Sequence, residues 1–270
     1  MNEPTWCDVT VVMTTYGNAD FTNASVWALR RFYPNLRVIF ADGHPVQPFQ
    51  GTLLHPDHYP WPTTGDFGLV WLPGACTEDC RNAAVACVET PYVLFMDNDC
   101  KVIGPDAIPL CLEAFTEYPK CAASGWYGLV VKDWERREAY VGTDFTDHMQ
   151  LDATQATFSI HATDVYRTVG GMPKEPFWPS VPKELWLDVK LPAYTGDFTI
   201  CREYKKALWE VVSPRKALPI LHWTQAVAWM SDAKSTKPFD TWWAANTTHI
   251  RISPLNRWRE VIGEEKKDRV

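Results

Sequence analysis

The chain has 270 residues, of which 46% are hydrophobic and 22% charged, so it can bury a sizeable core and is neither disordered nor fibrous. The formal net charge of −7 disfavours a nucleic-acid partner held by a basic surface. No stretch approaches the length of a membrane-spanning helix and the N-terminus lacks signal-peptide features, so we expect no membrane span and a cytoplasmic location.

Strands and helices alternate over the first part of the chain. Short apolar or β-branched runs predict four strands, at 8–13, 36–41, 69–72 and 91–96. Apolar residues at helical spacing predict three helices, one beginning near residue 20 and two at 76–88 and 105–118. The stretch 44–68, rich in Pro, His and Thr, is expected to be a long surface connection. This alternation predicts an α/β fold with a doubly wound, mostly parallel sheet, whose ligands bind beyond the carboxyl ends of the strands.

The pattern changes in the second part of the chain. Further strands are predicted at 121–131, 139–142, 154–161 and 218–222, together with a helix at about 199–209 and an irregular, proline-rich segment at 173–192. The eight cysteines lack disulfide-like or zinc-like spacing, and Cys80 and Cys87 fall on the apolar face of a predicted helix. We therefore interpret the cysteines as small buried hydrophobic residues.

Two carboxylates follow the most continuously apolar of the predicted strands. Asp97 and Asp99 are spaced i, i+2 on a turn, where they can share a divalent cation, and oxygen ligands suit Mg²⁺ or Mn²⁺. The same tripeptide also occurs in ordinary solvated loops, so the interpretation as a cation site rests on its position at the end of a strand. Arg81 points away from the apolar face of its helix, either toward a phosphate or these carboxylates, or into a surface salt bridge with Glu78.

Several short motifs, taken in order, resemble family 2-type glycosyltransferases with the GT-A fold. The first half carries VTVVMTTYGN, ADG, GACTEDCRNAAV and PYVLFMDND, which resemble the nucleotide-binding half of that family over roughly residues 8–101. The second half carries VYRTVGGMP and TGDFTICREYKKALWEVV, which extend the resemblance to about residue 222. The resemblance implies an inverting, metal-dependent transfer of a sugar from a nucleoside diphosphate sugar, with a UDP-sugar favoured, to an acceptor hydroxyl.

The resemblance also implies roles for individual residues. It places Thr14, Tyr16, Asp42, Arg81 and Asp97 at the donor nucleotide, with Asp42 at the base or ribose. Asp99 would be the principal ligand of Mn²⁺ or Mg²⁺, and His222 would be a further metal or phosphate ligand. His161 is a weaker candidate, interpreted as a polar residue at a strand end.

The resemblance of TGDFTICREYKKALWEVV to the start of a helix in that family implies that Asp197 is the general base. The family usually has glutamate directly before this aspartate, where this chain has Gly196. Asp197 can instead be a simple acid in the first turn of a helix, stabilised by the helix dipole, and Asp188 is a second candidate base.

The resemblance divides a single GT-A domain into three parts. Residues 1–103 would bind the nucleotide sugar, residues 104–232 would bind the acceptor and carry catalysis, and residues 233–270 would form a Trp-rich extension. Ten of the fourteen tryptophans lie beyond residue 101, where their rings suit stacking on a sugar, although they also suit a hydrophobic lid or core.

Two other functions fit the same residues. A nucleotidyltransferase also uses an α/β nucleotide fold with paired acids and a metal. A non-catalytic carbohydrate-binding relative would explain the tryptophans and the loss of glutamate at Gly196. The acceptor is not defined by the sequence: glycans, small hydroxylated molecules, protein side chains and, against the net charge, a modified nucleobase all remain open.

Overall fold

The computed structural model describes residues 3–16, 19–49, 66–126, 128–133, 138–142, 147–174, 196–222 and 250–252. Most of the expected 44–68 connection and of the 173–192 segment, including Asp188, lies outside these residues, as do nearly all residues of the expected Trp-rich extension. The proposed division at residues 103 and 232 stays a prediction.

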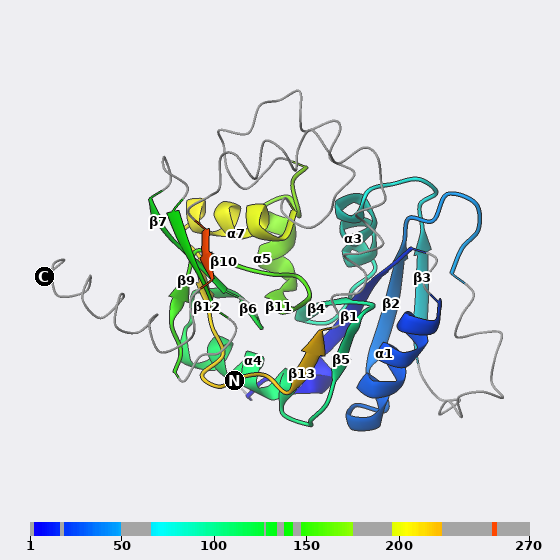
Figure 1. Cartoon of the computed structure of the whole chain (residues 1–270), viewed down its shortest axis with the longest axis horizontal. Helices are drawn as coiled ribbons and strands as arrows, with labels where there is room; N and C mark the ends of the chain where they lie inside the picture. Colours follow the sequence, from blue (N-terminus) through cyan, green and yellow to red (C-terminus); the bar gives the residue numbers. More distant parts are fainter. Residues whose placement is uncertain are drawn as a thin grey trace, which may run out of the picture.

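A large twisted sheet forms the centre of the molecule (Figure 1). Its strands, in spatial order, are β3 (Phe67–Trp71), β2 (Arg37–Asp42), β1 (Val9–Thr15), β4 (Tyr92–Asp97), β11 (Phe158–Ala162), β6 (Cys121–Gly125), β12 (Glu210–Val212) and β9 (Gln150–Leu151). The first four are mutually parallel, whereas β11 and β9 run antiparallel to their neighbours. The predicted mostly parallel α/β sheet is confirmed.

Helices cover both faces of this sheet (Figure 1). On one face lie α3 (Thr77–Ala86), α5 (Thr163–Thr168) and α7 (Gly196–Lys206), and on the other lie α1 (Ala19–Phe32) and α4 (Ala107–Glu117). Alternate side chains of the central strands point to opposite faces: Phe95 packs in the first core and Leu94 in the second. This double coverage explains why β4 is apolar without interruption.

Two smaller sheets complete the described fold. One consists of β10 (Ala153–Thr154), β7 (Gly128–Asp133), β8 (Glu138–Gly142) and β14 (Ile250–Ile252). The other pairs β5 (Cys100–Val102) with β13 (Ile220–His222) in antiparallel register. No helix among the described residues is both long and apolar enough to cross a membrane.

Two predicted strands are each divided in the structure. The run 121–131 forms β6 and β7 and passes from the main sheet to the smaller one, whereas the run 154–161 contributes to β10 and β11 and passes from the smaller sheet to the main one. Gly125, at the end of β6, packs closely against the second run: an added Cβ would lie 2.4 Å from Thr154 Oγ1 and 2.5 Å from Ser159 Cβ. The helix predicted at 199–209 is also shifted: it begins at Gly196 and ends at Lys206, just before Leu208, which has a φ of 64°.

Candidate active site

The register of the parallel strands brings distant polar residues to one edge of the sheet. Thr14 of β1 lies opposite Asp97 of β4, and Thr15 of β1 lies opposite Asp42 of β2. All of these residues stand at carboxyl ends of strands, which is where α/β sheets of this kind bind ligands. The candidate site is therefore built at this edge.

Asp97 is held by three side chains from distant parts of the chain. The Arg81 guanidinium of α3 donates to Asp97 Oδ1 at 2.8 Å, and Thr14 Oγ1 lies 3.4 Å from the same oxygen. Thr157 Oγ1 donates to Asp97 Oδ2 at 2.9 Å. Enclosure by the protein raises the pKa of Asp97, and the charge of Arg81 opposes that rise. Of the two interpretations of Arg81, the structure supports contact with the carboxylates of the turn.

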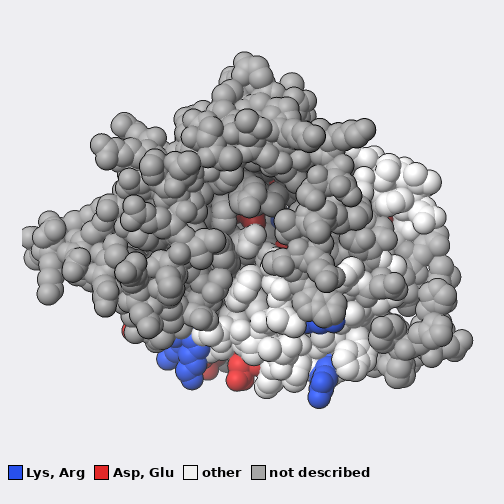
Figure 2. All heavy atoms as spheres, viewed as in Figure 1, with Lys and Arg blue, Asp and Glu red and all other residues white. Residues whose placement is uncertain are grey.

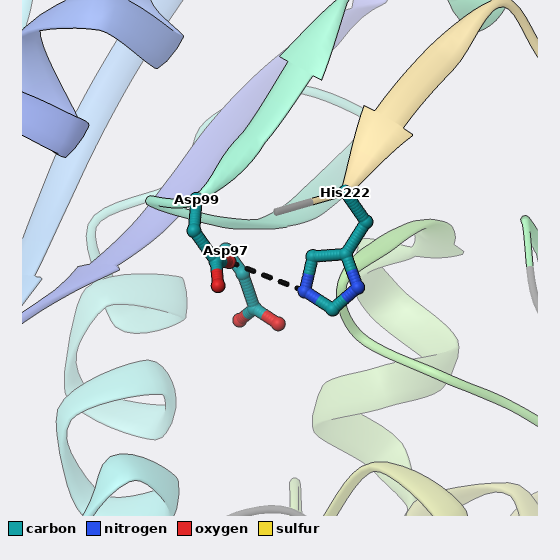
Figure 3. A group of neighbouring side chains, drawn as sticks. All are labelled: Asp97, Asp99 and His222. Carbon is teal, nitrogen blue, oxygen red and sulfur yellow. Dashed lines mark ion pairs between the residues drawn. The ribbon is translucent and has the colours of Figure 1, made fainter. Parts of the chain in front are cut away.

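Asp97, Asp99 and His222 form a compact group (Figure 3). Each offers one ligand atom, and these atoms all lie within 4.8 Å of one another, the one group of this kind among the described residues. His222 Nε2 lies 3.3 Å from Asp99 Oδ1. Two carboxylates and an imidazole are a donor set that suits Mn²⁺, because its nitrogen ligand fits a transition metal better than Mg²⁺.

The fold positions the three members of this group independently of any metal. The backbone carbonyl of Asn98 accepts a hydrogen bond of 2.6 Å from Ser25 of α1, and the Asn98 amide donates to Thr22 of the same helix at 3.1 Å. These contacts fix the turn that carries both aspartates. Antiparallel pairing of β13 with β5 places His222 opposite Cys100, directly beside Asp99.

The neighbours of His222 raise its affinity for a proton. Burial lowers the pKa of His222, but the hydrogen bond and charge of Asp99 and the charge of Asp97 raise it, and the pKa ends above its ordinary value. A proton and a cation therefore compete for the same nitrogen.

Asp197 lies in the first turn of α7 and is buried. Its Oδ2 accepts the backbone N–H of Ala156 at 3.1 Å, and its Oδ1 accepts that of Phe198 at 3.1 Å. Burial raises the pKa of Asp197 to about 7, against the lowering effect of Arg81. Because Thr157 follows Ala156 and bonds to Asp97, two adjacent residues connect Asp197 with the carboxylates at the end of β4.

Asp42 lies at the end of β2 and is engaged by the loop that follows. Its side chain is fully buried, and its two oxygens accept the backbone N–H groups of His44 at 3.0 Å and Phe49 at 2.6 Å. Asp42 therefore organises the loop after β2, and its contact with a base or ribose stays a prediction.

The exposed groups beside Asp42 are aromatic. The Tyr16 ring lies 5.6 Å from that of His44, and Trp71 Nε1 donates to the His44 carbonyl at 2.8 Å. Tyr16 and Trp71 are 43% and 38% exposed, so their rings are accessible to a ligand. Of Tyr16, His44 and Trp71, only Tyr16 was predicted from the sequence to lie at the donor nucleotide.

His161 is part of the core. It is fully buried, with one ring nitrogen 2.8 Å from Ser159 Oγ and the other 2.9 Å from the Tyr204 hydroxyl. Burial lowers the pKa of His161 to about 3, so the ring is neutral. As expected, His161 is a polar residue near the end of a strand, β11, and there it belongs to this buried hydrogen-bonded network.

Sequence reasoning missed Thr157 and considered Glu78 only as a surface partner of Arg81. Thr157 precedes β11 in a segment with no recognisable motif, so no local signal marks it. Glu78 is buried, whereas glutamate is mostly exposed in proteins, so the sequence gives no sign of this burial.

The surface around these elements shows no broad patch of one charge on the face seen in Figure 2, as far as the described residues go. Basic and acidic side chains lie together along its lower edge, and acidic atoms are also visible near its middle.

No family model matches the chain. Over 91 residues, 34% of this chain, it is 36% identical to the β-1,4 N-acetylgalactosaminyltransferase 1 of Rattus norvegicus, of which the match spans 15%. Two solved structures are similar in fold. The mannosyltransferase PcManGT of Pyrobaculum calidifontis, in complex with GDP-Man and Mn²⁺, has a TM-score of 0.50 and 13% identity, covering 77% of this chain and 54% of that one. GalNAc-T7 with UDP, GalNAc and Mn²⁺ has a TM-score of 0.54 and 9% identity, covering 79% and 43%.

These similarities agree with the architecture described above. The chain has the GT-A glycosyltransferase fold, as its motifs predicted. It spans about half the length of the two solved structures and a small part of the rat protein.

Proposed function

We propose that this chain is a metal-dependent glycosyltransferase that moves a sugar from a nucleoside diphosphate sugar to an acceptor hydroxyl. The observation that carries this proposal is the group of Asp97, Asp99 and His222 at the carboxyl edge of a GT-A sheet. The neighbouring Arg81 and Thr157 support it, because they hold one of the carboxylates in place.

Asp97, Asp99 and His222 would hold Mn²⁺ or Mg²⁺. When bound, such a cation neutralises negative charge that develops on a departing diphosphate. Arg81 is buried and hydrogen-bonded to Asp97, so its part is to orient that carboxylate. Thr14 and Tyr16, at the end of β1, lie on the side of the site where the nucleoside would bind.

Asp197 would act as the general base in an inverting displacement. A carboxylate with a pKa of about 7 accepts a proton more readily than an ordinary aspartate, and at neutral pH a large fraction is ionised. Each of its oxygens accepts one backbone N–H and keeps a second lone pair for an acceptor hydroxyl. A single displacement of this kind needs one base and no covalent intermediate.

UDP-N-acetylgalactosamine is the donor to test first. The rat relative is named as an N-acetylgalactosaminyltransferase, and GalNAc-T7 was solved with UDP, GalNAc and Mn²⁺. The exposed rings of Tyr16 and Trp71 suit stacking on a uracil base.

The test is turnover of UDP-GalNAc with Mn²⁺ and a panel of hydroxylated acceptors, followed by release of UDP. We expect UDP release that Asp99→Ala abolishes and that Asp164→Asn, at an exposed position on α5, leaves intact. Inversion at the anomeric carbon, read by proton NMR of the product, would support Asp197 as the base. Release of pyrophosphate would indicate a nucleotidyltransferase, and sugar binding without any turnover would indicate a carbohydrate-binding protein.

A further inference from the structure

Gly196, the residue before Asp197, is packed against a carboxylate from another helix. A Cβ added to Gly196 would lie 2.5 Å from Glu78 Cγ and 2.8 Å from Glu78 Oε1. Glu78 stands in the first turn of α3 and is only 6% exposed. Its side chain therefore fills the space that any side chain at position 196 would enter.

Backbone conformation does not explain why glycine stands at position 196. The glycines with positive φ in the described ranges are Gly74, Gly170 and Gly171. Gly196 is the first residue of α7 and has a helical backbone, which alanine also adopts. The contact with Glu78 is thus the structural reason for the missing side chain.

Glu78 belongs to the charged surroundings of Asp197. Arg81, Asp97 and Glu78 all act on the Asp197 carboxyl, and the Cys201 thiol lies one turn further along α7. Glu78 and Arg81 are spaced i, i+3 and therefore share one face of α3. That face presents Arg81 to Asp97 and Glu78 to the start of α7.

We propose that Glu78 is the positioning residue of the candidate base and supplies, from α3, the second carboxylate that the family resemblance places at position 196. Its negative charge lies at the N-terminal end of α7, where the helix dipole favours an acid. By occupying this space it holds the first turn of α7, and with it Asp197, against α3. This inference rests on the proposed function, because the role of Asp197 as a base does.

Exchanging the carboxylate between the two helices tests this inference. Glu78→Gln removes the charge and keeps the shape, whereas Gly196→Ala displaces Glu78 without changing any charge. The double variant Glu78→Ala/Gly196→Glu returns a carboxylate to the same space from α7. Asp79→Asn is the matched control, because Asp79 is also in the first turn of α3 but pairs with the exposed Lys174.

We expect Gly196→Ala, which displaces Glu78, to lower kcat for UDP-GalNAc on the order of 10²-fold with KM little changed, since a misplaced base affects the reacting geometry and not donor binding. Glu78→Gln should lower kcat by a smaller factor, because it removes only the charge at the N-terminal end of α7 and keeps the shape. In an Asp197→Asn background, Glu78→Gln should have no further effect. The double variant should recover at least about tenfold over Glu78→Ala, and Asp79→Asn should stay within about twofold of the parent. A kcat unchanged by Glu78→Gln, or no recovery by exchange, would overturn the inference.

Thermal unfolding separates this inference from the proposed function. Gly196→Glu alone should lower Tm, because two carboxylates then compete for one space, and adding Glu78→Ala should restore part of the loss. If the two changes do not couple, the inference fails even in an active protein. If they couple but the parent releases no UDP from any donor, the proposed function fails, and with it the catalytic part of the inference.

Discussion

The chemistry of Asp197 depends strongly on its surroundings. Burial raises its pKa from an ordinary 3.8 to about 7, so the carboxyl gains its charge within the neutral range. If Asp197 is the base, kcat/KM for sugar transfer should rise with pH up to about 7 and then level off. A pH–rate profile checks this, and a profile without an acidic limb near 7 would contradict it.

The same shift predicts an effect on stability. Between the ordinary pKa and about 7, folded Asp197 holds a proton that the unfolded chain has released, so this group makes the folded state less stable as pH rises through that window. Asparagine does not titrate. The Tm of Asp197→Asn relative to the parent should therefore increase from about pH 4 to pH 7. A constant difference in Tm across this range would show that the pKa of the Asp197 carboxyl is not raised in the folded protein.

Which site residues can be found from sequence depends on whether a local pattern marks them. Asp97 and Asp99 follow an apolar run, and this marks a strand end. Asp42 also ends a strand, but whether its oxygens face a ligand or the backbone of the next loop is decided by how that loop folds. The role of Glu78 depends on a residue more than a hundred positions away, which no local pattern reports.

At the scale of elements, the side chain of Asn82 connects α3 with α5 and with the loop that follows α5. Asn82 Nδ2 donates to the Met172 carbonyl at 2.9 Å, and Asn82 Oδ1 accepts the Met172 N–H at 2.9 Å and the Tyr166 hydroxyl at 2.6 Å. Because Arg81 directly precedes Asn82, these hydrogen bonds also position the guanidinium that holds Asp97.

Asn82→Ala should therefore destabilise the fold by about 1–3 kcal/mol, because buried partners at Met172 and Tyr166 lose their hydrogen bonds. Chemical denaturation measures this difference. Lys174→Ala is the control, since its ion pair with Asp79 is largely exposed and should contribute below about 1 kcal/mol. If both substitutions lowered the free energy of unfolding equally, the Asn82 hydrogen bonds would contribute no more to stability than the exposed ion pair.

Two predicted strands are each divided in the structure, and the sequence pattern did not predict these divisions. Residues 121–131 and 154–161 were each predicted as one strand, although Gly125 and Gly128 interrupt the first of these runs. The first four strands and α3 and α4 were predicted to within a few residues, because each coincides with one uninterrupted apolar pattern. At the division, Gly125 packs closely against Thr154 and Ser159, a contact between segments that local patterns do not report.

Gly125→Ala tests that packing. An added Cβ would also lie 2.9 Å from the Phe158 carbonyl oxygen, so the backbone itself would have to move, and overpacking of this kind costs about 1–3 kcal/mol or more. Gly74→Ala is the comparison, because it meets no atom within 4 Å but has a φ of 72°. Its cost should be about 1–2 kcal/mol, from backbone conformation alone. Denaturation of both variants measures the costs, and a Gly125→Ala protein as stable as its parent would contradict this account.

At the scale of the whole molecule, the candidate metal group joins distant parts of the chain. Asp97 and Asp99 belong to the first half of the sequence, whereas His222 arrives through β13, after the chain has completed the main sheet. A cation bound by all three would bind only the folded chain, since the unfolded chain does not bring them together. Its binding energy therefore adds to global stability.

Mn²⁺ should raise the Tm of the protein, with a stabilisation of about 2.7 kcal/mol at a hundred times its Kd. The effect should grow as pH rises, because the pKa of His222 lies above its ordinary value and a proton competes for the same nitrogen at lower pH. Scanning calorimetry with and without Mn²⁺ at two pH values measures both. Asp99→Asn should remove the stabilisation, whereas Asp164→Asn, at an exposed side chain, should retain it. A stabilisation that survives in Asp99→Asn would place the cation elsewhere and remove the main support for a metal-dependent transfer at this edge of the sheet.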